Sequence, residues 1–259
     1  THSVGMAHHA APGWMIDGYP EIKAEHFWAM PGVAETYDGV LNDINGRHLR
    51  EEHVRAALDT ARGGPVPEGA VGGGTGMIAY EYKGGTGTAS RRVGDHMVGV
   101  LVQANHGIRD WLTVFGTHVG PHLRDDLLYE HERGSIIVVL GTDAPMMPHQ
   151  IQRLARRAAI GIGRNGTPGG NSSGDIFIAF STANPIPRAE METGKLGFEF
   201  LSDGDFDPYY LAAVEATEEA VINAMLAGED FETLKPAGKT CRALRPEALL
   251  AAIRKAKAG

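Results

Sequence analysis

Apolar residues in this chain form short runs separated by glycine, proline and polar residues. Residues 136–141, Ile-Ile-Val-Val-Leu-Gly, form the clearest of these runs and directly follow Arg133-Gly134-Ser135. Because β-branched residues are enriched in strands, this run predicts a buried strand that begins next to Ser135. Further apolar runs predict strands at residues 96–104, at residues 176–180, where the strand should be buried, and at residues 197–201.

Helical periodicity predicts four helices. In residues 49–62 the apolar positions recur at i, i+3, i+4 and i+7, and Gly63-Gly64-Pro65 ends the pattern. Pro148, the Asp207-Pro208 pair and Pro246 each suit the first turn of a helix. The side chains that we expect to face inward are, helix by helix, Val54, Ala57, Leu58 and Ala61; Ile151, Leu154, Ala155, Ala158 and Ile162; Leu211, Val214, Val221, Ile222 and Met225; and Leu249, Leu250 and Ile253.

The densest cluster of glycines lies in residues 71–90. Residues 74–79, Gly-Thr-Gly-Met-Ile-Ala, satisfy the dinucleotide-binding pattern G-x-G-x-x-G/A. However, no strand precedes them, and residues 77–82 alternate like a strand where that motif requires a helix. The sequence therefore predicts two strands joined through residues 83–87, with glycines at points where backbones crowd a pocket.

Composition excludes several classes of function. The net charge of −8 argues against a nucleic-acid partner, since phosphate binding needs clustered Lys and Arg. No apolar run approaches the ~18 residues of a membrane span. The single Cys241 excludes an internal disulfide framework and is consistent with a reducing compartment such as the cytoplasm. The histidines lack partner ligands at metal spacing, so we assign no metal and expect no cofactor.

The Gly134–Ser135 bond divides the chain into two halves of nearly equal length. If this bond is cut, Ser135 becomes a new N-terminus that carries a nucleophile, its hydroxyl, and a base, its α-amine. An α-amine has a pKa of about 7.7–8.0 and is partly neutral at pH 7, as a general base should be. A glycine before the serine permits the strained geometry that such a cut requires.

Polar residues beside the predicted strands are further candidates. Asn105 follows a strand and could donate to an oxyanion, or it could occupy a left-handed turn before Gly107. Ser173 and Asp175 stand at the entrance of the strand at residues 176–180. Hydroxyls and carboxylates in that position are typical of active sites and equally of turns.

Several long segments resemble the DmpA family, peptidase family S58. They are residues 72–77 (GGGTGM), 83–90 (KGGTGTAS), 102–105 (VQAN), 134–139 (GSIIVV) and 173–177 (SGDIF). They occur in the order found in the family and cover nearly the whole chain. Members of the family are L-aminopeptidase/D-esterase/amidases and include the β-peptidyl aminopeptidases.

The resemblance implies a single domain with a four-layer α/β/β/α sandwich, similar in architecture to N-terminal-nucleophile hydrolases but differently connected. It implies a precursor that cuts itself between Gly134 and Ser135 into an α-chain segment, residues 1–134, and a β-chain, residues 135–259. Such αβ units commonly assemble in fours. Family members also carry a further segment ahead of the residues that match 1–5, so we expect this chain to be the C-terminal part of a longer protein.

The resemblance also assigns roles to individual residues. Ser135 would be the nucleophile and Asn105 an oxyanion donor. Ser173 and Asp175 would assist the nucleophile, although some relatives carry Glu at the second of these positions. A hydroxyl becomes an effective nucleophile only when a base removes its proton, and the α-amine of Ser135 lies within reach.

Glu35 and Tyr37 complete the set, with Tyr37 counted among the catalytic residues. Alternation would place both side chains on the same side of a strand, although a surface turn with a solvated glutamate is the favoured interpretation from the residues alone. The resemblance implies that both line the pocket. A carboxylate there would pair with the N-terminal ammonium of a substrate and disfavour blocked N-termini.

The favoured function is an autoprocessed serine aminopeptidase. Its substrates would be short peptides, aminoacyl amides or esters with a free amino terminus, and a preference for β-peptides stays open. One alternative is an acyltransferase like the ornithine acetyltransferases, which share the architecture but use threonine as nucleophile. Another is a relative that only binds amino-terminated ligands.

Overall fold

The computed structural model describes residues 1–25, 27–128, 131–186 and 194–258. Helices are formed by α1 (Val4–Gly18), α2 (Pro20–Ala24), α3 (Glu51–Asp59), α4 (Pro148–Ala155), α5 (Arg157–Arg164), α6 (Asp207–Leu226) and α7 (Pro246–Ala258). Strands are β1 (Ile78–Ala79), β2 (Tyr82–Lys83), β3 (Gly85–Val93), β4 (His96–Asn105), β5 (Thr113–Val114), β6 (Thr117–His118), β7 (Ser135–Thr142), β8 (Ile176–Ser181), β9 (Phe231–Glu232) and β10 (Thr240–Cys241).

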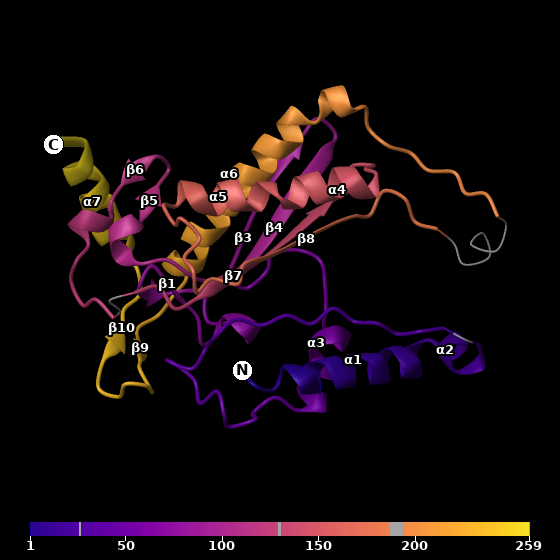
Figure 1. Cartoon of the computed structure of the whole chain (residues 1–259), viewed down its shortest axis with the longest axis horizontal. Coiled ribbons are helices and arrows are strands. Elements are labelled where there is room, and N and C mark those ends of the chain that lie inside the picture. The colour runs from indigo at the N-terminus through magenta and orange to yellow at the C-terminus, as the bar shows by residue number, and fades with distance from the viewer. Residues whose placement is uncertain (26, 129–130, 187–193, 259) are drawn as a thin grey trace.

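A four-stranded sheet of order β3-β4-β7-β8 lies at the centre (Figure 1). β3, β4 and β7 pair antiparallel, whereas β7 and β8 pair parallel. The strands expected at residues 96–104, 136–141 and 176–180 are therefore confirmed, each with one or more extra residues. In the register of β4 with β7, Asn105 lies opposite Ser135.

One face of this sheet carries the core. The alternating valines of β4 and the apolar residues of β7 at positions 136, 138 and 140 are fully buried there. Helix α6 packs on β3 and β4, and α4 packs on β8 (Figure 1). A Cβ at Gly87 would overlap the Ala220 carbonyl, so this glycine lets α6 approach the strand closely.

The opposite face of the sheet is only partly covered by the described residues. Ile176, Ile178 and Phe180 of β8 are 45%, 54% and 50% exposed. The prediction that this strand is buried is wrong for these residues, because the helices cover only the face that carries Phe177 and Ala179. Residues 197–201, expected as a strand, lie in a loop, where Asn184 makes two hydrogen bonds to the Glu199 backbone.

The helices expected from the sequence are present, but several side chains expected to face inward are exposed. α3 occupies most of residues 49–62, but it packs on α1 and not on the main core. Of the side chains expected inward there, Ala57, Leu58 and Ala61 are exposed. The single helix expected from Pro148 is divided at Arg156 into α4 and α5, with its apolar stripe turned inward as expected. Leu211 and Leu250, expected inward, are more than half exposed. Helix α6 begins at Asp207 itself, without a side-chain cap.

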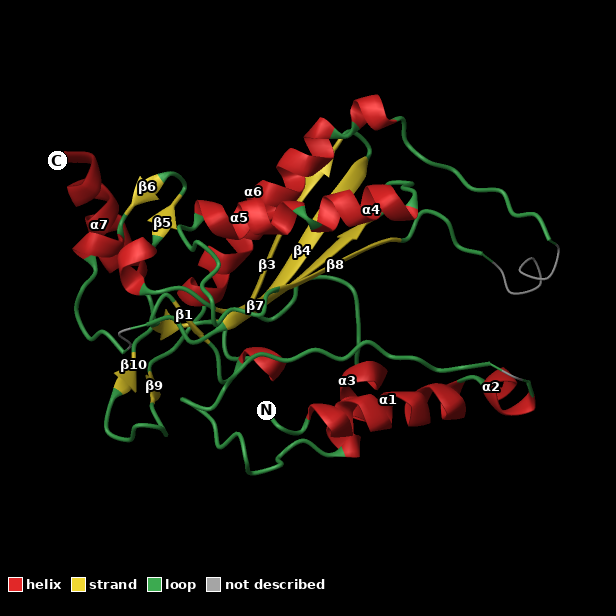
Figure 2. Cartoon of the chain, viewed as in Figure 1, coloured by secondary structure: helices red, strands yellow, loops and turns green. Residues whose placement is uncertain are grey.

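The first part of the chain contains helices but, among the described residues before Ile78, no strand (Figure 2). Helices α1 and α2 were not predicted, since their sequence has no clean period. The strand suggested for Glu35 and Tyr37 is absent, and both lie in a loop. No helix in the described ranges has the length and apolar character to cross a membrane.

The glycine-rich segment forms a hairpin. Residues 77–82 do not make one strand, because the chain turns back at Tyr80 and Glu81, which have φ of 50° and 60°. The crowding expected at the glycines is confirmed: a Cβ at Gly84 would overlap the Ala104 carbonyl, and one at Gly85 the Gly69 carbonyl. β1, not a helix, follows Gly76, so the dinucleotide-binding motif lacks its structural context.

Candidate active site

Ser135 is the first residue of β7, at the edge of the sheet where β4 ends. Its hydroxyl oxygen accepts a hydrogen bond of 2.8 Å from the backbone N–H of Gly174. A donor in this position favours negative charge on the oxygen. The hydroxyl thus faces the loop that precedes β8.

Ser173 and Asp175 lie in this same loop. The Ser173 hydroxyl donates to Asp175 Oδ1 over 2.5 Å, and the backbone N–H of Ile136 donates to the same oxygen over 3.1 Å. Because β7 and β8 are parallel neighbours, the loop before β8 lies beside the start of β7. The side chains of Ser173 and Asp175 therefore lie beside Ser135, as expected for groups that assist it.

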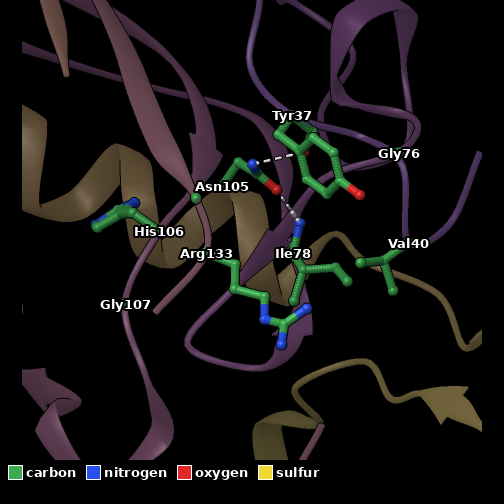
Figure 3. A pocket seen from close by; sticks show the side chains of 9 residues that line it. Tyr37, Val40, Gly76, Ile78, Asn105, His106, Gly107 and Arg133 are labelled. Atoms are coloured by element: carbon green, nitrogen blue, oxygen red, sulfur yellow. Dashed lines mark hydrogen bonds between the residues drawn. The ribbon is translucent and has the colours of Figure 1, made fainter. Parts of the chain in front are cut away.

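Asn105 closes β4 and is 4% exposed. Its Oδ1 accepts from the Ile78 N–H and its Nδ2 donates to the Tyr37 carbonyl, both over 2.8 Å (Figure 3). Since an amide nitrogen carries two hydrogens, one N–H of Asn105 is not used in this bond. The alternative reading of Asn105 as a left-handed turn residue is wrong, because the positive φ of 83° belongs to Gly107.

Gly134 lies against Asn105. A Cβ added to Gly134 would overlap the backbone oxygen of Asn105 and would lie 3.1 Å from its Nδ2. No other residue fits without a shift of β4, so glycine is required here by space. Gly134 and Asn105 therefore lie side by side at the proposed cut, and both line the same small pocket.

His106 directly follows Asn105 in the chain, and its ring packs edge-on against that of Tyr80, with ring centroids 5.2 Å apart. The imidazole is buried, and this burial lowers the pKa of His106 to about 4. Burial raises the pKa of the Tyr80 phenol well above its usual range. Both rings are thus neutral at pH 7, and neither places a charge beside Asn105.

Tyr37 contributes to the site through its backbone. Its carbonyl holds Asn105, whereas its side chain is 49% exposed and its hydroxyl lies close to Gly39 (Figure 3). The phenol, predicted as part of the catalytic set, points away from Asn105.

Glu35 lines a separate cavity of about 430 Å³ between the loop at residues 33–38, α3 and the glycine-rich segment. Its carboxylate accepts a 2.8 Å hydrogen bond from the α-ammonium of Thr1. Asp38 Oδ1 lies 2.9 Å from the same nitrogen. Gly76 lines both this cavity and the small pocket around Asn105 and Gly134, so the two sites adjoin.

The structure thus brings together Gly134, Ser135, Asn105, Ser173 and Asp175, and leaves Glu35 in the neighbouring cavity. The sequence interpretation missed the role of Asp38, although it lies three residues after Glu35. Two acidic residues at that spacing, separated by a hydroxyl and an aromatic residue, gave no sign that both would line one cavity.

Known proteins resemble this chain over most of its length. Residues 1–237 match the family described as Peptidase family S58. The β-peptidyl aminopeptidase BapA of Sphingosinicella microcystinivorans is 46% identical over 98% of this chain and 67% of that protein. The BapA of Sphingosinicella xenopeptidilytica is 43% identical over 88% of this chain and 61% of that protein.

A solved structure shares the fold of this chain. The L-aminopeptidase D-Ala-esterase/amidase from Ochrobactrum anthropi, described as a variant among the Ntn hydrolase fold, has a TM-score of 0.91 and 55% identity. The match covers 98% of this chain and 71% of that one. It confirms the expected α/β fold class. The chain spans about two thirds of the length of these relatives.

Proposed function

Because the chain belongs to peptidase family S58, we propose that it is an N-terminal-nucleophile serine aminopeptidase that matures by cutting its own Gly134–Ser135 bond. The observation that carries this proposal is the position of that bond. It lies between the amide of Asn105 on one side and Gly174, Ser173 and Asp175 on the other.

In the self-cleavage, Ser135 Oγ attacks the carbonyl carbon of Gly134. The free N–H of Asn105 stabilises the oxyanion, and the Gly174 N–H, which already binds Oγ, holds the attacking oxygen in line. The carbon–nitrogen bond breaks, and the proton of the hydroxyl passes to the departing nitrogen. Water then hydrolyses the resulting ester to a Gly134 carboxylate and restores the Ser135 hydroxyl.

In turnover, the new α-amine of Ser135 takes the proton from Oγ as the hydroxyl attacks the substrate carbonyl. The protonated amine then delivers this proton to the leaving group. Asn105 again binds the oxyanion, and water releases the acyl group. Asp175 and Ser173 fix the start of β7 through the Ile136 N–H, which keeps Oγ aimed at the substrate.

Substrates with a free amino terminus fit the neighbouring cavity. Glu35 and Asp38 both line this cavity, and two carboxylates side by side would pair with the α-ammonium of a peptide. The names of the relatives favour both α-amino and β-amino acid derivatives as substrates.

A denaturing gel with N-terminal sequencing tests the proposal. The wild-type protein should give two bands, one of which begins Ser-Ile-Ile-Val-Val. Ser135→Ala should give one band and no hydrolysis of an aminoacyl p-nitroanilide. Ser90→Ala, which removes an exposed hydroxyl on β3, serves as the matched control and should behave like the wild type. Full activity of Ser135→Ala would exclude this function.

A further inference from the structure

A carboxylate that the mechanism above does not use lies two residues before the proposed cut. Glu132 is 9% exposed. Its Oε1 accepts a 2.6 Å hydrogen bond from the backbone N–H of Gly107, and its Oε2 accepts a 3.0 Å bond from the N–H of Gly170. The Thr167 hydroxyl approaches Oε1 to 3.5 Å. Both oxygens of a buried charge are therefore engaged.

The two glycines belong to the segments that carry the rest of the proposed machinery. Gly107 lies two residues after Asn105, just past the end of β4, and Gly170 lies in the loop that contains Ser173 and Asp175. One side chain thus joins the cut segment to the segment of the oxyanion donor and to the segment of the assisting residues.

Space around Glu132 is adapted to these contacts. A Cβ at Gly170 would overlap Glu132 Oε2. At Gly107 the φ of 83° and the Tyr80 ring, 2.6 Å from the position of an added Cβ, likewise exclude a side chain. Both glycines leave their N–H groups open to the carboxylate, which would otherwise be buried without partners.

We propose that Glu132 is a positioning residue for self-cleavage. This inference rests on the proposed function. Glu132 is anchored by its carboxylate, and Ser135 is anchored by its place opposite Asn105 in the sheet. Only Arg133 and Gly134 lie between these two fixed points, and the three Cα–Cα steps from Glu132 to Ser135 span at most about 11 Å. The Gly134 carbonyl therefore has little freedom to leave the space between Ser135 Oγ and the Asn105 amide.

Turnover by the mature enzyme depends on Glu132 much less. After the cut, the reacting carbonyl belongs to the substrate and is no longer tied to Glu132 through the chain. Asn105 keeps its bonds to Ile78 and Tyr37, and Asp175 keeps its bond to Ile136. A defect at Glu132 should consequently slow the cut and spare the hydrolysis of added substrate. A residue that only supported the fold would affect both steps alike.

The test measures the two rates separately in Glu132→Ala and Glu132→Gln. Newly synthesised full-length protein is followed by gel from one band to two. After prolonged incubation, kcat/KM for an aminoacyl p-nitroanilide is measured per processed chain. Glu132→Ala should slow the cut by about 100-fold and Glu132→Gln, which keeps one acceptor, by about tenfold. Both should keep kcat/KM within about threefold of the wild type.

Glu68 provides the matched control, since its carboxylate also accepts a backbone N–H, that of Thr88, at the far edge of the sheet. Glu68→Gln and Glu68→Ala should cut at the wild-type rate. The inference is overturned if the Glu132 variants cut as fast as the wild type, if their cutting and turnover fall by the same factor, or if the Glu68 variants are equally slow. If the wild type itself stays uncut, the proposed function fails instead.

Discussion

Replacing Asn105 with alanine separates its proposed role as an oxyanion donor from its structural role. The substitution removes the amide that donates to the Tyr37 carbonyl and accepts from the Ile78 N–H. Ile78 is buried, so its N–H is left without a partner at a cost of about 1–3 kcal/mol. Against a typical stability of about 5–15 kcal/mol, most molecules of Asn105→Ala should stay folded at 25 °C.

The effect on chemistry should be much larger than this. Loss of one oxyanion donor typically costs about 10²–10³ in rate. Asn105 would act on the Gly134 carbonyl in the precursor and on the substrate carbonyl in the mature enzyme, so both steps should slow by a factor in that range. Partial unfolding cannot reproduce it, because most of the variant is folded.

The assay combines a denaturant titration with the two rates. Cutting is followed by gel, and turnover is measured per processed chain. Both rates are measured without denaturant at a temperature where the variant is folded. Asn223→Ala is the matched control, since it removes an amide that donates to the Thr88 carbonyl from α6, far from Ser135. If Asn105→Ala keeps both rates within about fivefold of the wild type, the oxyanion role is refuted.

Two further predictions concern charge. Glu35→Gln and Asp38→Asn should each lower kcat/KM for a free-amine substrate by about 10–100-fold and leave an N-acetylated one unchanged; equal losses on both would remove these residues from amine binding. Lys83 is fully buried, with its ammonium bonded to the Gly74 and Gly84 carbonyls, and burial lowers the pKa of Lys83 to about 8. Between pH 8 and about 10.5 the folded protein has lost this proton, whereas the unfolded chain still binds it. The free energy of unfolding, measured by urea titration relative to Lys83→Met, should therefore rise with pH across that window. A difference that stays constant with pH would contradict the lowered pKa.

Local patterns predicted the parts of the fold in which one face of an element is buried by its neighbours. β4 and β7 were found because their valines and isoleucines mark a strand without reference to the rest of the chain. The burial of β8 was mispredicted because an apolar run reveals nothing about which faces are covered. Likewise, Met77–Tyr82 alternates like a strand, but the left-handed Tyr80 and Glu81 fold it into a hairpin.

The candidate site divides in the same way. Gly134 and Ser135 were candidates from adjacent residues. Asn105, Ser173 and Asp175 were candidates from their places beside predicted strands, and the resemblance assigned their roles. Glu132 could not be recognised, because its partners Gly107 and Gly170 lie 25 and 38 residues away and offer only backbone N–H groups. A backbone donor leaves no trace in the identity of its residue, apart from the glycine that makes room for the acceptor.

The strand register would let the proposed cut at Gly134–Ser135 occur without damage to the core. Ser135 is the first residue of β7, so cleavage before it leaves every β4–β7 pair from Asn105–Ser135 to Val98–Thr142 in place. The same register sets the side of the sheet on which the Ser135 hydroxyl lies, and a slip of one residue would turn it to the other face. The buried residues at positions 136, 138 and 140 oppose such a slip, since it would expose all three. The apolar core thus fixes the alignment of Ser135 and would do so both before and after the proposed cut.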